Sequence, residues 1–64
     1  MRENDIRVVS KHAGWSNADI DNILNIIAEK HIHSIHSLCW WLAQIRDLVL
    51  RGKTKEQILS WLEK

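Results

Sequence analysis

The sequence predicts an all-α protein, a small orthogonal bundle of three to four helices that forms a single domain over residues 1–64. Proline is absent, and glycine occurs only at positions 14 and 52, so few residues interrupt a helical chain. Hydrophobic residues recur at spacings of three and four along most of the sequence. A chain of 64 residues has room for one hydrophobic core and for no second folding unit.

The first two helices are predicted on either side of Gly14. The first extends from about Asn4 to His12, and its apolar face is expected to comprise Ile6, Val9 and Ala13. The second extends from about Asn17 to Lys30. Its stripe has four residues with a fifth at the margin: Ile20, Ile23, Leu24, Ile27 and Ile26.

The third helix is predicted to begin near Ser34 or Ser37, to end near Arg51 and to lie at the centre of the bundle. Its stripe comprises Ile35, Leu38, Leu42, Ile45 and Val49. The alternative is one long helix fused with the second, because no strong breaker lies between them. We favour a break, since residues 31–37 are poor helix formers whose serines compete for backbone hydrogen bonds.

The last helix is predicted from about Lys55 to the end of the chain, and it is short enough to depend on tertiary packing. A glycine and, two residues later, a hydroxyl residue precede both this helix and the second one. Gly14 with Ser16, and Gly52 with Thr54, are typical of a helix end followed by a new N-cap. Internal duplication and coincidence explain this shared pattern equally well.

Charge and cysteine content limit the cellular compartments and the classes of partner that we expect for the chain. The net charge of +1 comes from nine basic and eight acidic residues scattered along the sequence, so no strong field toward nucleic acid is expected. A lone cysteine, Cys39, excludes an internal disulfide and favours a reducing, cytoplasmic location. The polar N-terminus and the lack of a long apolar run predict no secretory signal and no membrane partner.

The segment from His31 to Cys39 contains the residue types of a metal site, His31, His33, His36 and Cys39. Structural zinc usually takes two ligands from each of two separated segments, and His12 is the only further imidazole. We therefore predict no metal and no cofactor. Cys39 with His36 is the only candidate nucleophilic pair, and no oxyanion site accompanies it, so we predict that the chain is not an enzyme.

The aromatic content points to a binding surface. The chain has four tryptophans and neither phenylalanine nor tyrosine, and so small a domain cannot bury four indoles completely. Trp41 and Trp61 are expected in the core, and Trp15 is expected to cover a helix end.

Trp40 is the exception among the four. Helical spacing places it beside His36 and Gln44, away from the core stripe, with Leu50 further along the same side. A tryptophan on such a face is a typical anchor of a protein interface. Our leading hypothesis is a protein-binding module or small regulatory inhibitor that uses these four residues and can form a homodimer. The alternative is that Trp40 packs within the monomer.

A second functional hypothesis comes from residues 9–23. They place a small residue, Ser10, four positions before the turn glycine and then isoleucines at inward positions, which resembles the general helix-turn-helix pattern. The resemblance covers about a quarter of the chain and implies a small DNA-binding regulator. Its DNA-contacting residues would be Lys11, Asn17, Ala18 and Asn22. Against it, the recognition helix is expected to expose Asp19 and Asp21, and it contains no cation before Lys30.

Overall fold

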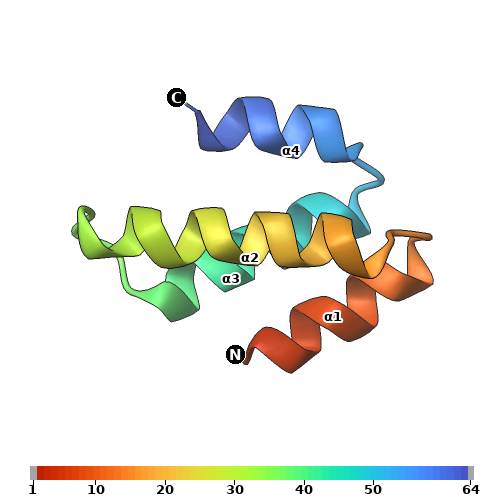
Figure 1. Cartoon of the computed structure of the whole chain (residues 1–64), viewed down its shortest axis with the longest axis horizontal. Coiled ribbons are helices and arrows are strands. Elements are labelled where there is room, and N and C mark those ends of the chain that lie inside the picture. The colour runs from red at the N-terminus through yellow and green to blue at the C-terminus, as the bar shows by residue number, and fades with distance from the viewer. Residues whose placement is uncertain (1, 64) are drawn as a thin grey trace.

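The computed structural model describes residues 2–63 and confirms an all-α helical bundle. Its described residues form four helices: α1 (Glu3–His12), α2 (Asn17–Ile32), α3 (Leu38–Leu50) and α4 (Lys55–Leu62). α2 packs against each of the other three helices, and α1 also packs against α3 (Figure 1). The central helix is therefore α2. Our prediction that the third helix lies at the centre was wrong. The sixteen residues of α2 make it the longest helix, and it is long enough to contact all the others.

The chain breaks between α2 and α3, as predicted, and residues 33–37 form the α2–α3 connection. Of the two predicted starts, the later one is correct, because the Ser37 side chain accepts a hydrogen bond from the Trp40 N–H and caps α3. Ile35 therefore lies outside the helix. Its placement in the core stripe was wrong, since 98% of its surface is exposed.

One residue of the predicted α1 face is also misplaced. Ala13 is exposed, because α1 ends at His12 and the chain turns away at Gly14. Ser10 is buried in its place, beside Ile6 on the inner face of the helix. Its hydroxyl has no hydrogen-bond partner among the described residues, so its burial carries an energetic cost.

The core draws on all four helices. Ten hydrophobic residues form it: Ile6, Ile20, Ile23, Leu24, Ile27, Leu42, Ile45, Val49, Ile58 and Leu62. The accessible surface of 4272 Å² is close to the roughly 4250 Å² expected for a folded monomer of this mass. A single copy is therefore as compact as an ordinary monomeric protein of this mass.

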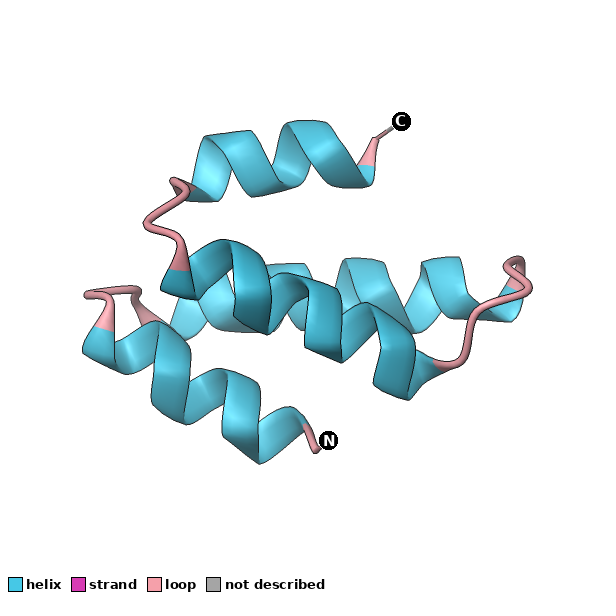
Figure 2. Cartoon of the chain, turned by 180° about the vertical axis from the view of Figure 1, so that it is seen from behind, coloured by secondary structure: helices cyan, strands magenta, loops and turns pink. Residues whose placement is uncertain are grey.

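The α1–α2 and α3–α4 turns share one geometry and lie at the same end of the molecule (Figures 1 and 2). Gly14 has φ +88° and Gly52 has φ +81°, the left-handed region that favours glycine. The residue after each glycine donates its N–H to a carbonyl five residues earlier, which closes the helix end. Ser16 and Thr54 then cap the following helices by accepting a backbone N–H. We call this end, residues 13–16 and 51–55 with Asp19, the turn end.

Among residues 2–63, no helix is both long and apolar enough to cross a bilayer.

Candidate functional site

A cluster of aromatic side chains lies at the opposite end of the bundle. His36 stacks on Trp40 with ring centroids 3.7 Å apart and an interplanar angle of 11°. Two further ring pairs extend the cluster toward the core, both in edge-to-face arrangements. The ring centroids of Trp40 and Trp41 are 5.0 Å apart, and those of Trp41 and Trp61 are 5.6 Å apart. The α2–α3 connection, α3 and α4 each contribute to the cluster, so residues distant in sequence meet there.

Local hydrogen bonds place His36 over the start of α3. The Ser34 side chain accepts a hydrogen bond from the His36 N–H at 3.0 Å, and Ser37 accepts one from the Trp40 N–H at 3.2 Å. These two contacts fold the connection back onto the first turn of the helix. The imidazole of His36 then stacks on the Trp40 ring.

Trp40 and Trp41 occupy different faces of α3, because consecutive helical residues are about 100° apart. Trp41 packs against the buried core, as predicted, and so does Trp61. The Lys30 ammonium lies 6.0 Å from the centroid of the Trp41 ring, within range of a cation–π contact. The Trp41 indole nitrogen is buried and has no hydrogen-bond partner among the described residues.

Three of the four predicted partner-binding residues lie together. His36 stacks on Trp40, and Gln44 follows one helical turn later on the same side of α3; all three side chains are half-buried. We call these three residues the indole face. Leu50 does not belong to it. It lies ten residues after Trp40, about 15 Å along the helix axis, and is 68% exposed at the other end of α3.

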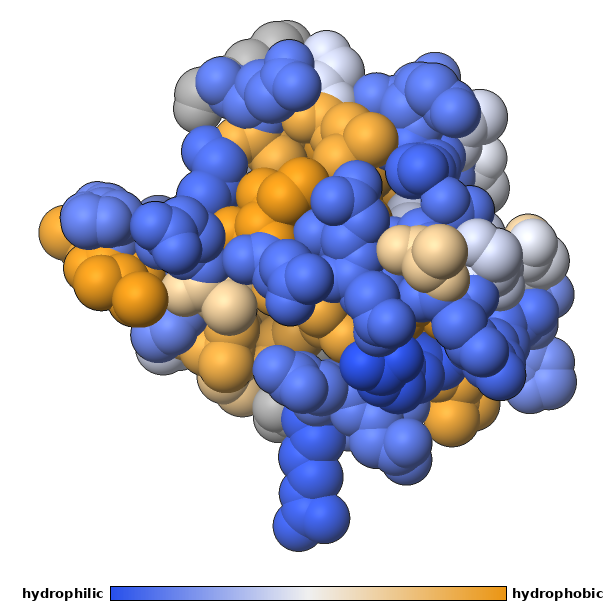
Figure 3. Space-filling model, viewed as in Figure 1, coloured by the Kyte–Doolittle hydropathy of each residue, from blue (hydrophilic) through white to orange (hydrophobic). Residues whose placement is uncertain are grey.

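The sequence analysis missed two exposed residues next to the cluster. Ile32 is 67% exposed and Ile35 is 98% exposed, and we call this pair the apolar tip. In Figure 3 hydrophobic atoms project from the end of the molecule where α2 meets the α2–α3 connection. For Ile35 a usable signal was present in the sequence, because an isoleucine inside a histidine- and serine-rich break cannot share a helical stripe.

The residues of the DNA-binding alternative are all exposed. Lys11 lies near the end of α1, and Asn17, Ala18 and Asn22 lie in the first half of α2. Lys11 also lines a shallow surface depression of about 380 Å³ with Val8 and His12.

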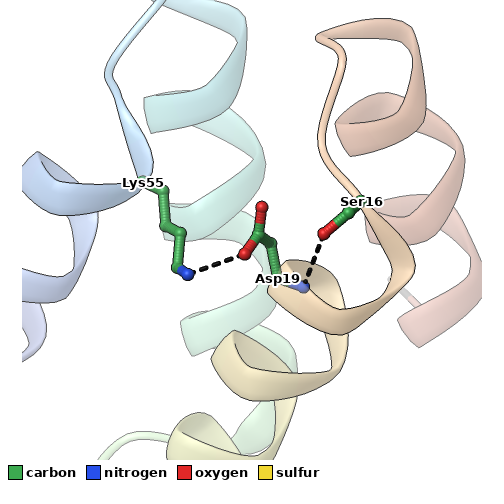
Figure 4. Close-up of polar contacts among 3 residues, drawn as sticks. All are labelled: Ser16, Asp19 and Lys55. Atoms are coloured by element: carbon green, nitrogen blue, oxygen red, sulfur yellow. Dashed lines mark hydrogen bonds and ion pairs between the residues drawn. The ribbon is translucent and has the colours of Figure 1, made fainter.

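The two aspartates near the start of α2, which we had expected to be exposed, both contact a cationic side chain of the same chain. Asp19 is half-buried, and its carboxylate accepts a hydrogen bond from the Lys55 ammonium at 2.6 Å (Figure 4). Asp21 is exposed, as predicted, and forms an ion pair with Arg7 at 2.8 Å. Each aspartate therefore already has a cationic partner within the chain.

The Asp19–Lys55 pair ties the start of α2 to the start of α4. The hydrogen bond from Lys55, followed by that from Ser16, lowers the pKa of the Asp19 carboxyl below 3.8. The same hydrogen bond to Asp19 raises the pKa of the Lys55 ammonium above 10.5. The ionised pair is thus favoured across the neutral range.

The histidines and the cysteine between His31 and Cys39 do not lie together as a set of metal ligands. Among residues 2–63, no three His, Cys, Asp or Glu side chains lie close enough to hold a metal ion. In this fold His36 instead contributes its ring to the stack on Trp40.

Comparison of the chain with protein-family models, curated proteins and solved structures finds no significant match in any of the three. The site geometry alone therefore carries the functional proposal.

Proposed function

We propose that this chain is a protein-binding domain that contacts its partner through the indole face, His36, Trp40 and Gln44. The observation that carries the proposal is the stack of His36 on Trp40 at 3.7 Å. Tryptophan is enriched among the residues that dominate binding energy in protein interfaces. Here one indole is half-exposed and already held in a defined orientation.

Contacts with the core hold the Trp40 ring in place, which supports the proposal. The Trp40 ring meets Trp41 edge-on, and Trp41 packs against the core and against Trp61. Ordering a flexible side chain on binding costs roughly 0.5–1.5 kcal/mol, and a pre-ordered indole avoids most of this cost. Gln44 adds an amide that can donate and accept hydrogen bonds beside the ring.

A domain of 64 residues with one contact face suits a small regulator or inhibitor, which acts by occupying a surface of its partner. A second copy of the chain is one partner that the face can accept. Because one copy is already as compact as an ordinary monomer of this mass, we expect such a homodimer to be reversible and dependent on concentration.

A Trp40→Ala variant tests the proposal, with Leu50→Ala as the control at the far end of α3. Sedimentation over a range of concentrations measures self-association, and affinity capture with each variant as bait measures partner binding. We expect Trp40→Ala to remain folded and to lose a contact that the wild type and Leu50→Ala both make. A loss of roughly 3 kcal/mol in unfolding free energy with no change in association would instead show that Trp40 is part of the core.

The helix-turn-helix alternative has less support. Lys11 is the only cation among its four residues, whereas phosphate contacts depend on lysine and arginine. The helix that would enter the groove also carries Asp21 on its exposed surface. Sedimentation with mixed-sequence duplex DNA at low and moderate salt tests this alternative, and a salt-sensitive shift would favour it over protein binding.

A further inference from the structure

Helix α4 is attached to the bundle differently from the other three helices. α1, α2 and α3 each pack against the other two, so these three helices form a closed set of contacts. α4 packs chiefly against α2, on the side away from α1 (Figures 1 and 2), and reaches α3 through the contact of Trp61 with Trp41. The contacts among α1, α2 and α3 therefore do not depend on α4.

The helical state of α4 depends on its docking to α2. The helix has eight residues, whereas an isolated helix in water needs about 12–15 residues to be even marginally stable. Ile58 and Leu62 are its two buried residues. Its Lys55 ammonium pairs with the Asp19 carboxylate of α2 at 2.6 Å. Because these contacts are lost together when α4 leaves α2, we expect the helix to unfold as it detaches.

The α3–α4 turn can act as a hinge for this motion. All residues from Arg51 to Thr54 are exposed, so a change of backbone conformation within the turn uncovers no buried side chain of its own. At the other terminus, α1 is longer, with ten residues, and packs against both α2 and α3. α4 is therefore the helix that we expect to open most easily, because it has the fewest contacts to lose.

We propose that α4 detaches from α2 as one unit while α1, α2 and α3 stay folded, and that this opening regulates the indole face. Trp61 leaves with α4, so Trp41 loses one of the two indoles that it contacts. Trp41 supports the Trp40 ring, whose orientation is then less restricted, and binding through the indole face is weaker in the open state. The regulation rests on the proposed function, whereas the detachment does not.

Amide hydrogen exchange of the full chain, followed by NMR, tests the detachment. Within α4 the amides of residues 58–61 donate to carbonyls one turn earlier, beginning with Ile58 to Thr54 at 3.0 Å. We expect these four amides to share one opening constant, at least roughly tenfold larger than that of the core amides of α2. Equal constants in α4 and α2 would overturn the proposal, and so would a steady rise toward the C-terminus, which indicates fraying.

Ile58→Val and Ile6→Val form a matched pair, because Ile58 of α4 and Ile6 of α1 are both fully buried. The contacts of both residues are lost when the whole domain unfolds, but only those of Ile58 are lost when α4 detaches. We therefore expect Ile58→Val to speed exchange in α4 and in α2 alike, roughly two- to tenfold. Ile6→Val is expected to speed exchange in α2 and to leave α4 unchanged. An equal effect of Ile6→Val on α4 would contradict independent detachment.

The Trp41 indole tests the link to the indole face. Its nitrogen is buried, so exchange of the indole N–H reports when this part of the ring is uncovered. We expect that exchange to accelerate with the α4 amides in Ile58→Val and to stay unchanged in Ile6→Val. Any other pattern would show that α4 does not cover Trp41 and would remove the regulation while the detachment stood. Failure of the Trp40→Ala experiment would overturn the protein-binding proposal, and the regulation with it, but not the detachment.

Discussion

The two ends of the bundle differ in how far their polar groups are paired and their apolar side chains are buried. At the turn end, two left-handed glycines, two hydroxyl caps and the Asp19–Lys55 pair provide internal partners for backbone and charge. At the other end, the connection is capped by Ser34 and Ser37 but leaves two isoleucines in solvent and one indole half-exposed. The contrast indicates that the turn end satisfies its backbone and charged groups internally, and we propose the opposite end, where the indole face lies, as the contact surface for a partner.

The two ends also differ in the residues that they use to change direction. Each reversal at the turn end needs only a glycine, a spacer and a cap. The α2–α3 connection lacks glycine and spans residues 33–37. Within this connection His36 folds back onto Trp40, whereas Ile35 remains 98% exposed.

The largest effect is expected for Trp41→Ala. Trp41 lies beside the half-exposed Trp40 but packs against the core. Trp41 packs against buried residues, Trp40 and Trp61, so we expect a loss of about 3 kcal/mol in unfolding free energy. Urea denaturation followed by circular dichroism measures it. A loss below about 1 kcal/mol would show that the whole aromatic cluster is a surface feature.

Gly14→Ala and Gly52→Ala test whether the turn end serves folding. Each is expected to cost about 1–2 kcal/mol, because a Cβ is unfavourable at positive φ. No atom lies within 4 Å of the position that either Cβ would take, so the cost comes from the backbone and not from a clash. Thermal and urea unfolding measure both variants. An unchanged stability in either would mean that the turn relaxes to another conformation at no cost.

The Asp19–Lys55 pair predicts a pH dependence that arises at the turn end. Folding lowers the pKa of Asp19, so its contribution to stability is present above about pH 3.8 and is lost as the pH falls through the lowered value. Folding raises the pKa of Lys55, so its contribution is present below about pH 10.5 and is lost as the pH rises through the raised value.

The effect should be small, because both side chains are about one-third exposed and salt screens them. Melting temperatures of the wild type and Asp19→Asn, measured from neutral to strongly acidic pH, provide the test. We expect the variant to lose less stability on acidification than the wild type does. Parallel curves would show that the pair contributes nothing to folding.

The smallest effect is expected at the other end. Ile35→Ser should leave the unfolding free energy within about 0.5 kcal/mol of the wild type, since the side chain contacts little in the folded chain. The same urea titration measures this variant, with Ile45→Val as a buried reference expected to cost roughly 0.5–1.5 kcal/mol. A larger loss from Ile35→Ser than from Ile45→Val would place Ile35 in the core after all.

The candidate site was only partly predictable. Trp40 and His36 are four residues apart, so their proximity followed from spacing, but the ring stack did not. Leu50 lies apart from the other three predicted residues, because a general agreement in direction ignored its distance along the helix. Ile35 was misplaced because periodicity assigns an isoleucine to a core face unless the helix boundary is known to the residue, and Ile32 was not assigned to any face.

The sequence by itself determined the two glycine turns and the starts of α2 and α4, through Gly14, Gly52 and the capping residues Ser16 and Thr54, and it left Ser34 and Ser37 as two possible starts for α3. These signals act between residues within five positions of each other, so they are readable locally. Only the tertiary structure decided that α2 lies at the centre, that Asp19 meets Lys55 and that Trp41 meets Trp61. Such contacts depend on how the helices pack, because the partners are far apart in the chain and many packings would bury the same hydrophobic stripes.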